Sequence, residues 1–157
     1  MALSTVTGCM AYKLHVLDKT GVAGAVLIGT ALFGFAGIPG GSILLLFFLS
    51  SSLISRFQAV RKESLAEKFA KGHQRDLAQA LGNGVVAAVA AVLYALTESG
   101  SAWAGVVGAL AAANADTWAT ELGVLSSRPP RLITTRRPVS IGASGGITAE
   151  GSLAALA

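Results

Sequence analysis

The residues best placed to do chemistry in this sequence are two acids within an apolar stretch. The segment ANADTWATELG, residues 113–123, carries Asp116 and Glu121 in a run that is otherwise typical of a membrane helix. Ionisable side chains at membrane depth are costly and commonly mark ion, proton or substrate sites. The segment is therefore the first candidate for a functional site.

Helical spacing predicts what surrounds the first acid. Four residues recur at intervals of three and four and share one helix face: Asp116, Ala119, Thr120 and Gly123. The small residues on this face leave room for a bulky ligand beside the carboxylate. Asn114 and Glu121 point elsewhere around the helix, with Glu121 closer to the cytoplasmic end.

Two other segments carry groups suited to phosphate. Arginines and a glycine-rich turn, GASGGIT at 142–148, follow the acidic segment. Arginine binds phosphate through a two-pronged fork, and glycine-rich turns before helices can hold phosphate with backbone N–H groups. Upstream, RDLAQALGNG at 75–84 supplies Arg75, Asp76 and Asn83.

A carboxylate with no basic partner in its own span needs a cation. Mg²⁺ bridging Asp116 to phosphate oxygens would supply one, because Mg²⁺ favours one or two carboxylates together with phosphates. Arginines and backbone amides would offset the remaining charge, as phosphoryl transfer requires. Ion or proton coupling through Asp116, or a purely structural role, fits the same pattern and stays open.

Composition indicates a helical membrane protein. Of the 157 residues, 53% are hydrophobic and 13% charged, and the mean hydropathy is +0.65; soluble domains carry about a quarter charged residues. The 19 glycines suit close helix packing in lipid. We expect an all-α polytopic transmembrane bundle forming a single domain over residues 1–157.

The apolar runs predict about four full spans and a shorter fifth element. The spans are expected at 21–38, 42–57, 77–97 and 102–125, and the fifth from Gly145. IPGG is expected to form a tight turn between the first two spans. A cytoplasmic amphipathic helix is expected within 56–76, between spans two and three.

The charge distribution predicts the orientation. All 12 Lys and Arg lie before the first span, between the second and third, or after the fourth. By the positive-inside rule, the N-terminus and both long basic loops are cytoplasmic. Orientation and contact with anionic lipid account for these charges, so the lipid bilayer is the expected partner and nucleic acid is not.

The motifs resemble a known family. DTWATELG fits Asp-x-x-Ala-x-x-x-Gly, which resembles the signature of dolichol kinase, phytol kinase and phosphatidate cytidylyltransferase. Together with RDLAQALGNG and PVSIGASGGIT, it resembles the phytyl-phosphate kinase family, which includes animal transmembrane protein nineteen. The resemblance implies a helical membrane enzyme that phosphorylates an isoprenyl monophosphate to the diphosphate, with CTP as donor.

The resemblance also implies site residues. Asp116 would bind the metal and nucleotide, and Glu121 and Asp76 would assist catalysis. The expected nucleotide and phosphate contacts are Arg75, Asn83, Asn114, Thr120, Arg131, Thr134, Thr135, Arg136, Arg137, Gly142, Ser144, Gly145 and Gly146.

Family members continue through further spans, one with another acid near a glycine-rich segment, and this chain ends before them. A homo-oligomer could complete the site. The alternatives are a transporter or proton-coupled protein using Asp116, a cytidylyltransferase that makes a CDP-lipid, and a structural role.

Overall fold

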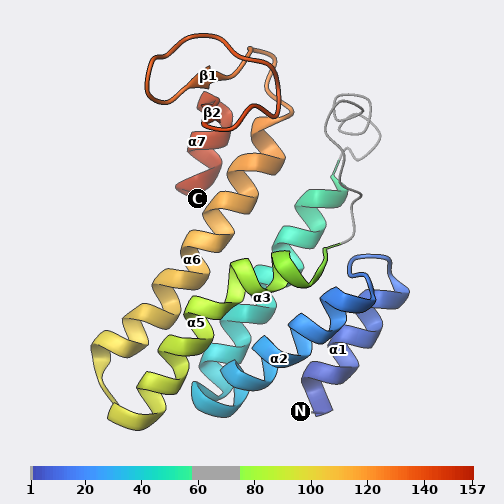
Figure 1. The fold of residues 1–157 in the computed structure, drawn as a ribbon, viewed down its shortest axis with the longest axis vertical. Coiled ribbons are helices and arrows are strands. Elements are labelled where there is room, and N and C mark those ends of the chain that lie inside the picture. The colour runs from blue at the N-terminus through green and yellow to red at the C-terminus, as the bar shows by residue number, and fades with distance from the viewer. Residues whose placement is uncertain (1, 58–74) are drawn as a thin grey trace. The chain divides into compact units, whose positions relative to one another are not determined.

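The computed structural model describes residues 2–57 and 75–157. Their regular elements are helices and one short strand pair, and the strands lie in the otherwise irregular loop 124–148 (Figure 1). The elements, in order, are α1 (Ala2–Lys13), α2 (Lys19–Phe35), α3 (Gly37–Arg56), α5 (Leu77–Thr97), α6 (Gly100–Gly123), β1 (Arg131–Leu132), β2 (Gly146–Ile147) and α7 (Ala149–Ala155).

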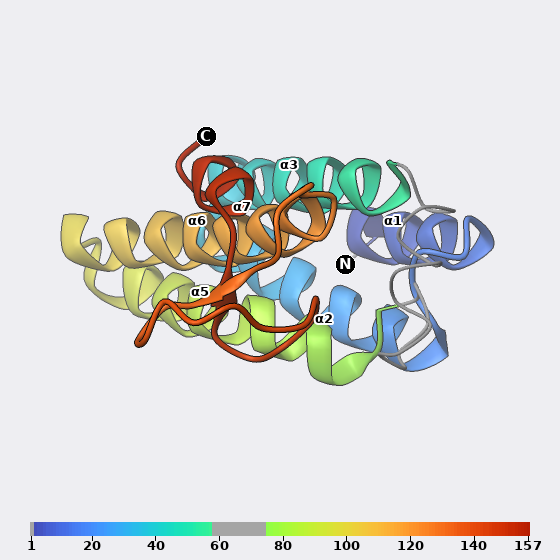
Figure 2. The same cartoon turned by 90° about the horizontal axis from the view of Figure 1, so that it is seen from above.

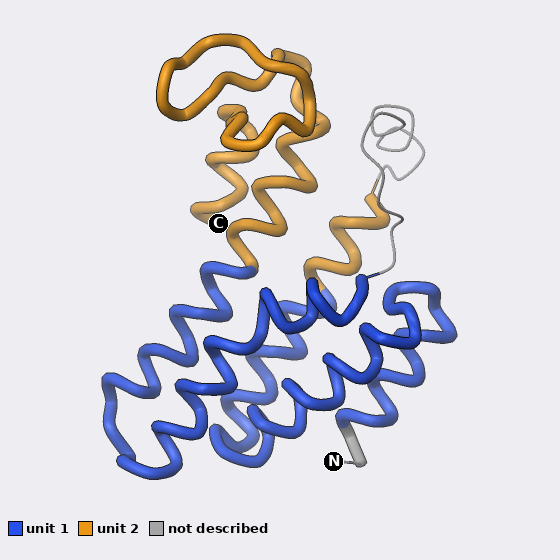
Figure 3. The backbone as a smooth tube through the Cα atoms, in the orientation of Figure 1, with its two compact units in different colours: residues 1–49, 72–113 blue, residues 50–71, 114–157 orange. Residues whose placement is uncertain are grey.

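The residues group into two compact units (Figure 3). Unit 1 comprises residues 1–49 and 72–113, and unit 2 comprises residues 50–71 and 114–157. Helices α3 and α6 contribute to both, because each begins in unit 1 and ends in unit 2. The two units are described separately below.

Close contact between α2 and α5 forms the centre of unit 1. A Cβ added at Gly24 would lie 2.7 Å from the Ala80 Cβ, and one at Gly84 would lie 2.6 Å from the Ile28 side chain. Small residues thus let the two backbones approach, as they do between membrane helices. The surrounding core consists of Ile28, Leu32, Ala36, Ala87, Ala90, Ala91, Val106 and Leu110.

Matching aspartates begin α2 and α5. Asp18 accepts a hydrogen bond from the Gly21 N–H at 2.7 Å, and Asp76 accepts one from the Gln79 N–H at 2.8 Å. Each satisfies a backbone donor that the helix leaves unpaired at its start. Arg75 joins the two starts, because its N–H donates to the Val16 carbonyl and its carbonyl accepts from the Asp18 N–H.

Apolar side chains cover much of the outside of the described helices. Leu27, Leu46, Leu53, Val86 and Leu96 are each more than 60% exposed. Two described helices, α3 and α5, are long and apolar enough to cross a membrane, and α2 is a shorter apolar helix. Such exposure would be costly in water but suits contact with lipid.

Unit 2 packs the C-terminal part of α6 against α7, which lie side by side in Figures 1 and 2. Thr148 begins α7 by accepting a hydrogen bond from the Gly151 N–H at 3.1 Å. A Cβ added at Gly151 would lie 2.7 Å from the Ala119 carbonyl oxygen and 3.1 Å from the Gly123 Cα. Glycines on both helices therefore permit this contact.

Several sequence expectations need correction. IPGG does not form the turn; the chain turns at Ala36 and Gly37, whose φ is +64°, and Pro39 lies in the first turn of α3. Proline is tolerated there because the first helical N–H groups have no partner within the helix. Residues 2–13 form a helix that the sequence did not indicate.

The fifth element also differs from its expectation. The helix begins at Ala149, because Gly146–Ile147 pairs antiparallel with Arg131–Leu132 and so extends the preceding chain. The expectation of an all-helical fold is confirmed, with one pair of two-residue strands added in the loop before α7. Most of the expected amphipathic helix in 56–76 lies outside the described residues.

Candidate functional site

Unit 2 contains a pocket of about 510 Å³ between the end of α6, the glycine-rich turn and α7. All four residues of the predicted α6 face line it: Asp116, Ala119, Thr120 and Gly123. Gly142, Ser144, Gly145 and Gly146 line it as well. The acid and the turn, distant in sequence, therefore share one pocket.

The conformation of the glycine-rich turn depends on its glycines. Gly142 and Gly145 have φ values of +82° and +74°, a region that side chains with a Cβ rarely adopt. The turn is held by hydrogen bonds from the Gly146 N–H to the Ala143 carbonyl at 3.0 Å and from the Ile133 N–H to the Gly145 carbonyl at 3.0 Å. This fixes the pocket wall that faces α6.

Asp116 is exposed to the pocket. Within residues 2–57 and 75–157, its carboxylate has no hydrogen bond or ion pair. The described residues contain no group of three or more His, Cys, Asp or Glu able to hold a metal ion alone. Asp116 is thus the carboxylate of this pocket that could contact a metal ion shared with a phosphate, since such an Mg²⁺ needs only one or two protein carboxylates.

Arg128, which the motifs do not single out, is the basic residue that lines this pocket. The backbone N–H of Arg128 donates to the Ser126 hydroxyl at 3.1 Å, and that hydroxyl donates to the Glu150 carboxylate at 2.9 Å. The pKa of Glu150 is lowered, first by a hydrogen bond from the backbone amide of Glu150 itself. The Ser126 hydroxyl and the positive charge of Arg128 lower it further. Glu150 is therefore ionised at neutral pH, beside the arginine.

The other predicted loop residues lie outside the pocket lining. These are Arg131, Thr134, Thr135, Arg136 and Arg137. The Arg131 guanidinium donates to the Arg136 carbonyl at 3.0 Å, which closes the loop on itself. All five are exposed, and nothing in their contacts tests the phosphate role expected for them.

Asn114 and Glu121 face α3 instead of the pocket, in line with the expectation that they point away from Asp116. The Ser50 hydroxyl donates to the Asn114 side-chain oxygen at 3.3 Å, and the Ser55 hydroxyl donates to Glu121 at 2.6 Å. Hydrogen bonds of this kind join neighbouring membrane helices. Both residues thus contact α3 within unit 2.

The remaining predicted residues belong to unit 1. Asp76 caps α5 as described, and Arg75 and Asn83 line a separate apolar groove. The structure therefore does not place these three residues in the pocket of unit 2.

Comparison with known proteins identifies the family. Residues 2–157 match the family model described as "Integral membrane protein DUF92". The chain is 38% identical over 172 residues to Protein PGR of Arabidopsis thaliana, covering 99% of this chain and 58% of that protein. It is 37% identical over 151 residues to an uncharacterized membrane protein of Methanocaldococcus jannaschii, covering 95% and 61%.

A more distant relative is Protein VTE6, chloroplastic, of Arabidopsis thaliana, which is 25% identical over 145 residues, covering 89% of this chain and 44% of that protein. No solved structure matches the chain. The chain spans about three fifths of the first two relatives. The family model and these relatives confirm the resemblance drawn from the three motifs, and the chain belongs to the integral membrane protein family DUF92.

Proposed function

We propose that the protein is a kinase that transfers the γ-phosphoryl group of CTP to an isoprenyl monophosphate, giving the isoprenyl diphosphate and CDP. One observation supports this most strongly: Asp116, Arg128 and the glycine-rich turn line the same pocket of about 510 Å³. Proteins use a carboxylate, an arginine and a backbone turn to position a nucleoside triphosphate and to neutralise its negative charge.

Each group has a separate task in this proposal. Asp116 holds Mg²⁺, which would neutralise charge on the transferred phosphoryl group. Arg128 attracts the phosphates, while the turn from Gly142 to Gly146 shapes the wall against which they lie. An oxygen of the substrate monophosphate attacks the γ-phosphorus as the bond to the β-phosphate oxygen breaks, so no protein nucleophile is needed.

The membrane arrangement forms part of the proposal. We propose that α2, α3, α5 and α6 cross the bilayer, with the N-terminus and basic loops in the cytoplasm. Exposed leucines and valines on these helices and the placement of all 12 Lys and Arg support this arrangement. The pocket residues after α6 then lie on the side where CTP is found.

The test determines which phosphorus atom of CTP is transferred to the lipid. Membranes containing the protein are given geranylgeranyl monophosphate, Mg²⁺ and CTP labelled at either the α- or the γ-phosphorus. We expect the γ-label alone to enter the lipid, and only when Mg²⁺ is present. Entry of the α-label would instead indicate a cytidylyltransferase. Entry of neither label would reject both enzymes and favour a transport or structural role. Membranes without the protein are the control.

A further inference from the structure

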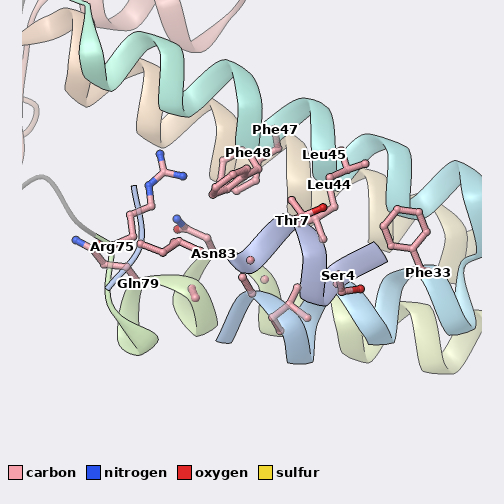
Figure 4. A pocket seen from close by; sticks show the side chains of 17 residues that line it. Ser4, Thr7, Phe33, Leu44, Leu45, Phe47, Phe48, Arg75, Gln79 and Asn83 are labelled. Carbon is pink, nitrogen blue, oxygen red and sulfur yellow. The ribbon is translucent and has the colours of Figure 1, made fainter. Parts of the chain in front are cut away.

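Arg75 and Arg128 each line a cavity, and different contacts hold them. Arg75 lines the apolar groove of unit 1, where its guanidinium lies 5.9 Å from the Phe47 ring centroid and 6.0 Å from that of Phe48 (Figure 4). Among the described residues, the Arg128 guanidinium has no such ring contact and no hydrogen bond. The place of Arg128 in the pocket of unit 2 therefore depends on how its backbone is held.

Two prolines restrict the backbone after Arg128. Proline has a fixed φ and confines the residue before it to extended conformations, so Pro129 and Pro130 leave Arg128 few backbone states. Pro130 is buried and lines the pocket, and its carbonyl accepts a hydrogen bond from the Val139 N–H at 2.9 Å. The chain that follows Arg128 is thus fixed in the pocket wall.

Ser126 holds the backbone before Arg128. Its N–H donates to the Gly123 carbonyl at 3.1 Å, which keeps it at the end of α6. Its hydroxyl has one proton to donate, and the Glu150 carboxylate at 2.9 Å is a closer and stronger acceptor than the Arg128 carbonyl at 3.1 Å. Donation to Glu150 leaves the hydroxyl oxygen free to accept the Arg128 N–H, at 3.1 Å.

Glu150 connects this turn to α7. It lies in the first turn of that helix, which begins at Ala149. The next two residues, Gly151 and Ser152, line the pocket, whereas Glu150 does not. The carboxylate is therefore placed to act on the pocket through Ser126 rather than by touching a ligand.

We propose that Ser126 and Glu150 are positioning residues that hold Arg128 where it can bind a polyphosphate in the pocket of unit 2. The ligand rests on the proposed function, whereas the hydrogen bonds that link the three residues do not. A carboxylate acting only as a negative charge beside Arg128 would weaken anion binding, so its removal would strengthen binding. The two roles thus predict effects of opposite sign.

The test measures binding of inorganic tripolyphosphate, with Mg²⁺, to the purified protein by calorimetry. Ser126→Ala and Glu150→Ala should each weaken binding about tenfold, which is within the range for residues of one hydrogen-bond network. Ser126→Thr keeps the hydroxyl and Glu150→Gln keeps an acceptor, so both should retain most of the affinity. Ser127→Ala is the matched control, because Ser127 is exposed and does not line the pocket.

A mutant cycle with Arg128 separates positioning from a general loosening of the fold. In an Arg128→Ala background, Ser126→Ala should cause no further loss of affinity, because the hydroxyl acts through that arginine. The double variant Ser126→Ala/Glu150→Ala should bind as weakly as either single variant, because the two residues form one link. Glu150 is exposed, so Glu150→Ala remains informative if Ser126→Ala does not fold.

Three results would overturn the proposal: no Arg128-dependent binding of tripolyphosphate, unchanged or tighter binding in Glu150→Ala, or a further loss from Ser126→Ala in the Arg128→Ala background. Failure of the kinase is distinguishable from each of them. Binding that depends on all three residues without phosphoryl transfer would retain the positioning pair and reject the kinase. Phosphoryl transfer with unchanged binding in both alanine variants would retain the kinase and reject the pair.

Discussion

Asp116→Asn should abolish formation of isoprenyl diphosphate. The substitution keeps the size of the side chain but removes the negative charge, and this carboxylate is the acid that lines the pocket of unit 2. Removing a single preorganised electrostatic contact commonly lowers kcat by about 100-fold or more. The rate is measured as transfer of the γ-label from CTP to lipid.

Glu121→Gln is the matched control for this prediction. Glu121 lies on the same helix but accepts a hydrogen bond from Ser55 at 2.6 Å, and glutamine can still accept that bond. We expect a rate close to that of the unchanged protein. Equal losses in Asp116→Asn and Glu121→Gln would show that Asp116 has no special part in the reaction.

Gly21→Ala should prevent stable packing of α2 against the start of α5. A Cβ at this position would collide with the Arg75 carbonyl oxygen, which already accepts the Asp18 N–H. A backbone atom held in this way cannot move aside as a flexible side chain can. We expect a destabilisation of about 3 kcal/mol, the upper part of the range for overpacked cores, measured by unfolding in detergent.

Gly34→Ala provides the control within the same helix. No atom lies within 4 Å of a Cβ added there, so the methyl group would meet open space. Alanine also favours helix over glycine by about 1 kcal/mol, so this variant should be as stable as the parent or slightly more so. If both variants unfolded alike, the close contact at Gly21 would not contribute to stability.

Local patterns in the sequence are sufficient to predict which α6 residues share a face and where α5 begins and ends. The four residues from Asp116 to Gly123 all line one pocket because helical spacing alone determines which side chains share a face. Helix α5 occupies Leu77–Thr97, as expected from its apolar run. An aspartate before it and a residue in the left-handed conformation after it, Glu98, define its two ends.

Contacts between segments that are far apart in the chain could not be predicted from local sequence patterns. The shared motifs associate Arg75 and Asn83 with Asp116, whereas in the structure Arg75 and Asn83 line a groove of unit 1. The sequence does not single out Arg128, because its place in the pocket depends on the fold of the loop between α6 and α7. Pro39 was misplaced because a proline can begin a helix as readily as it ends one.

The most direct test of the central claim is electron paramagnetic resonance of Mn²⁺, used in place of Mg²⁺, with the purified protein and CTP. We predict a bound Mn²⁺ signal that requires CTP, is present in the parent and in Glu121→Gln, and is lost in Asp116→Asn. An unchanged bound signal in Asp116→Asn would contradict the assignment of this carboxylate as the metal ligand.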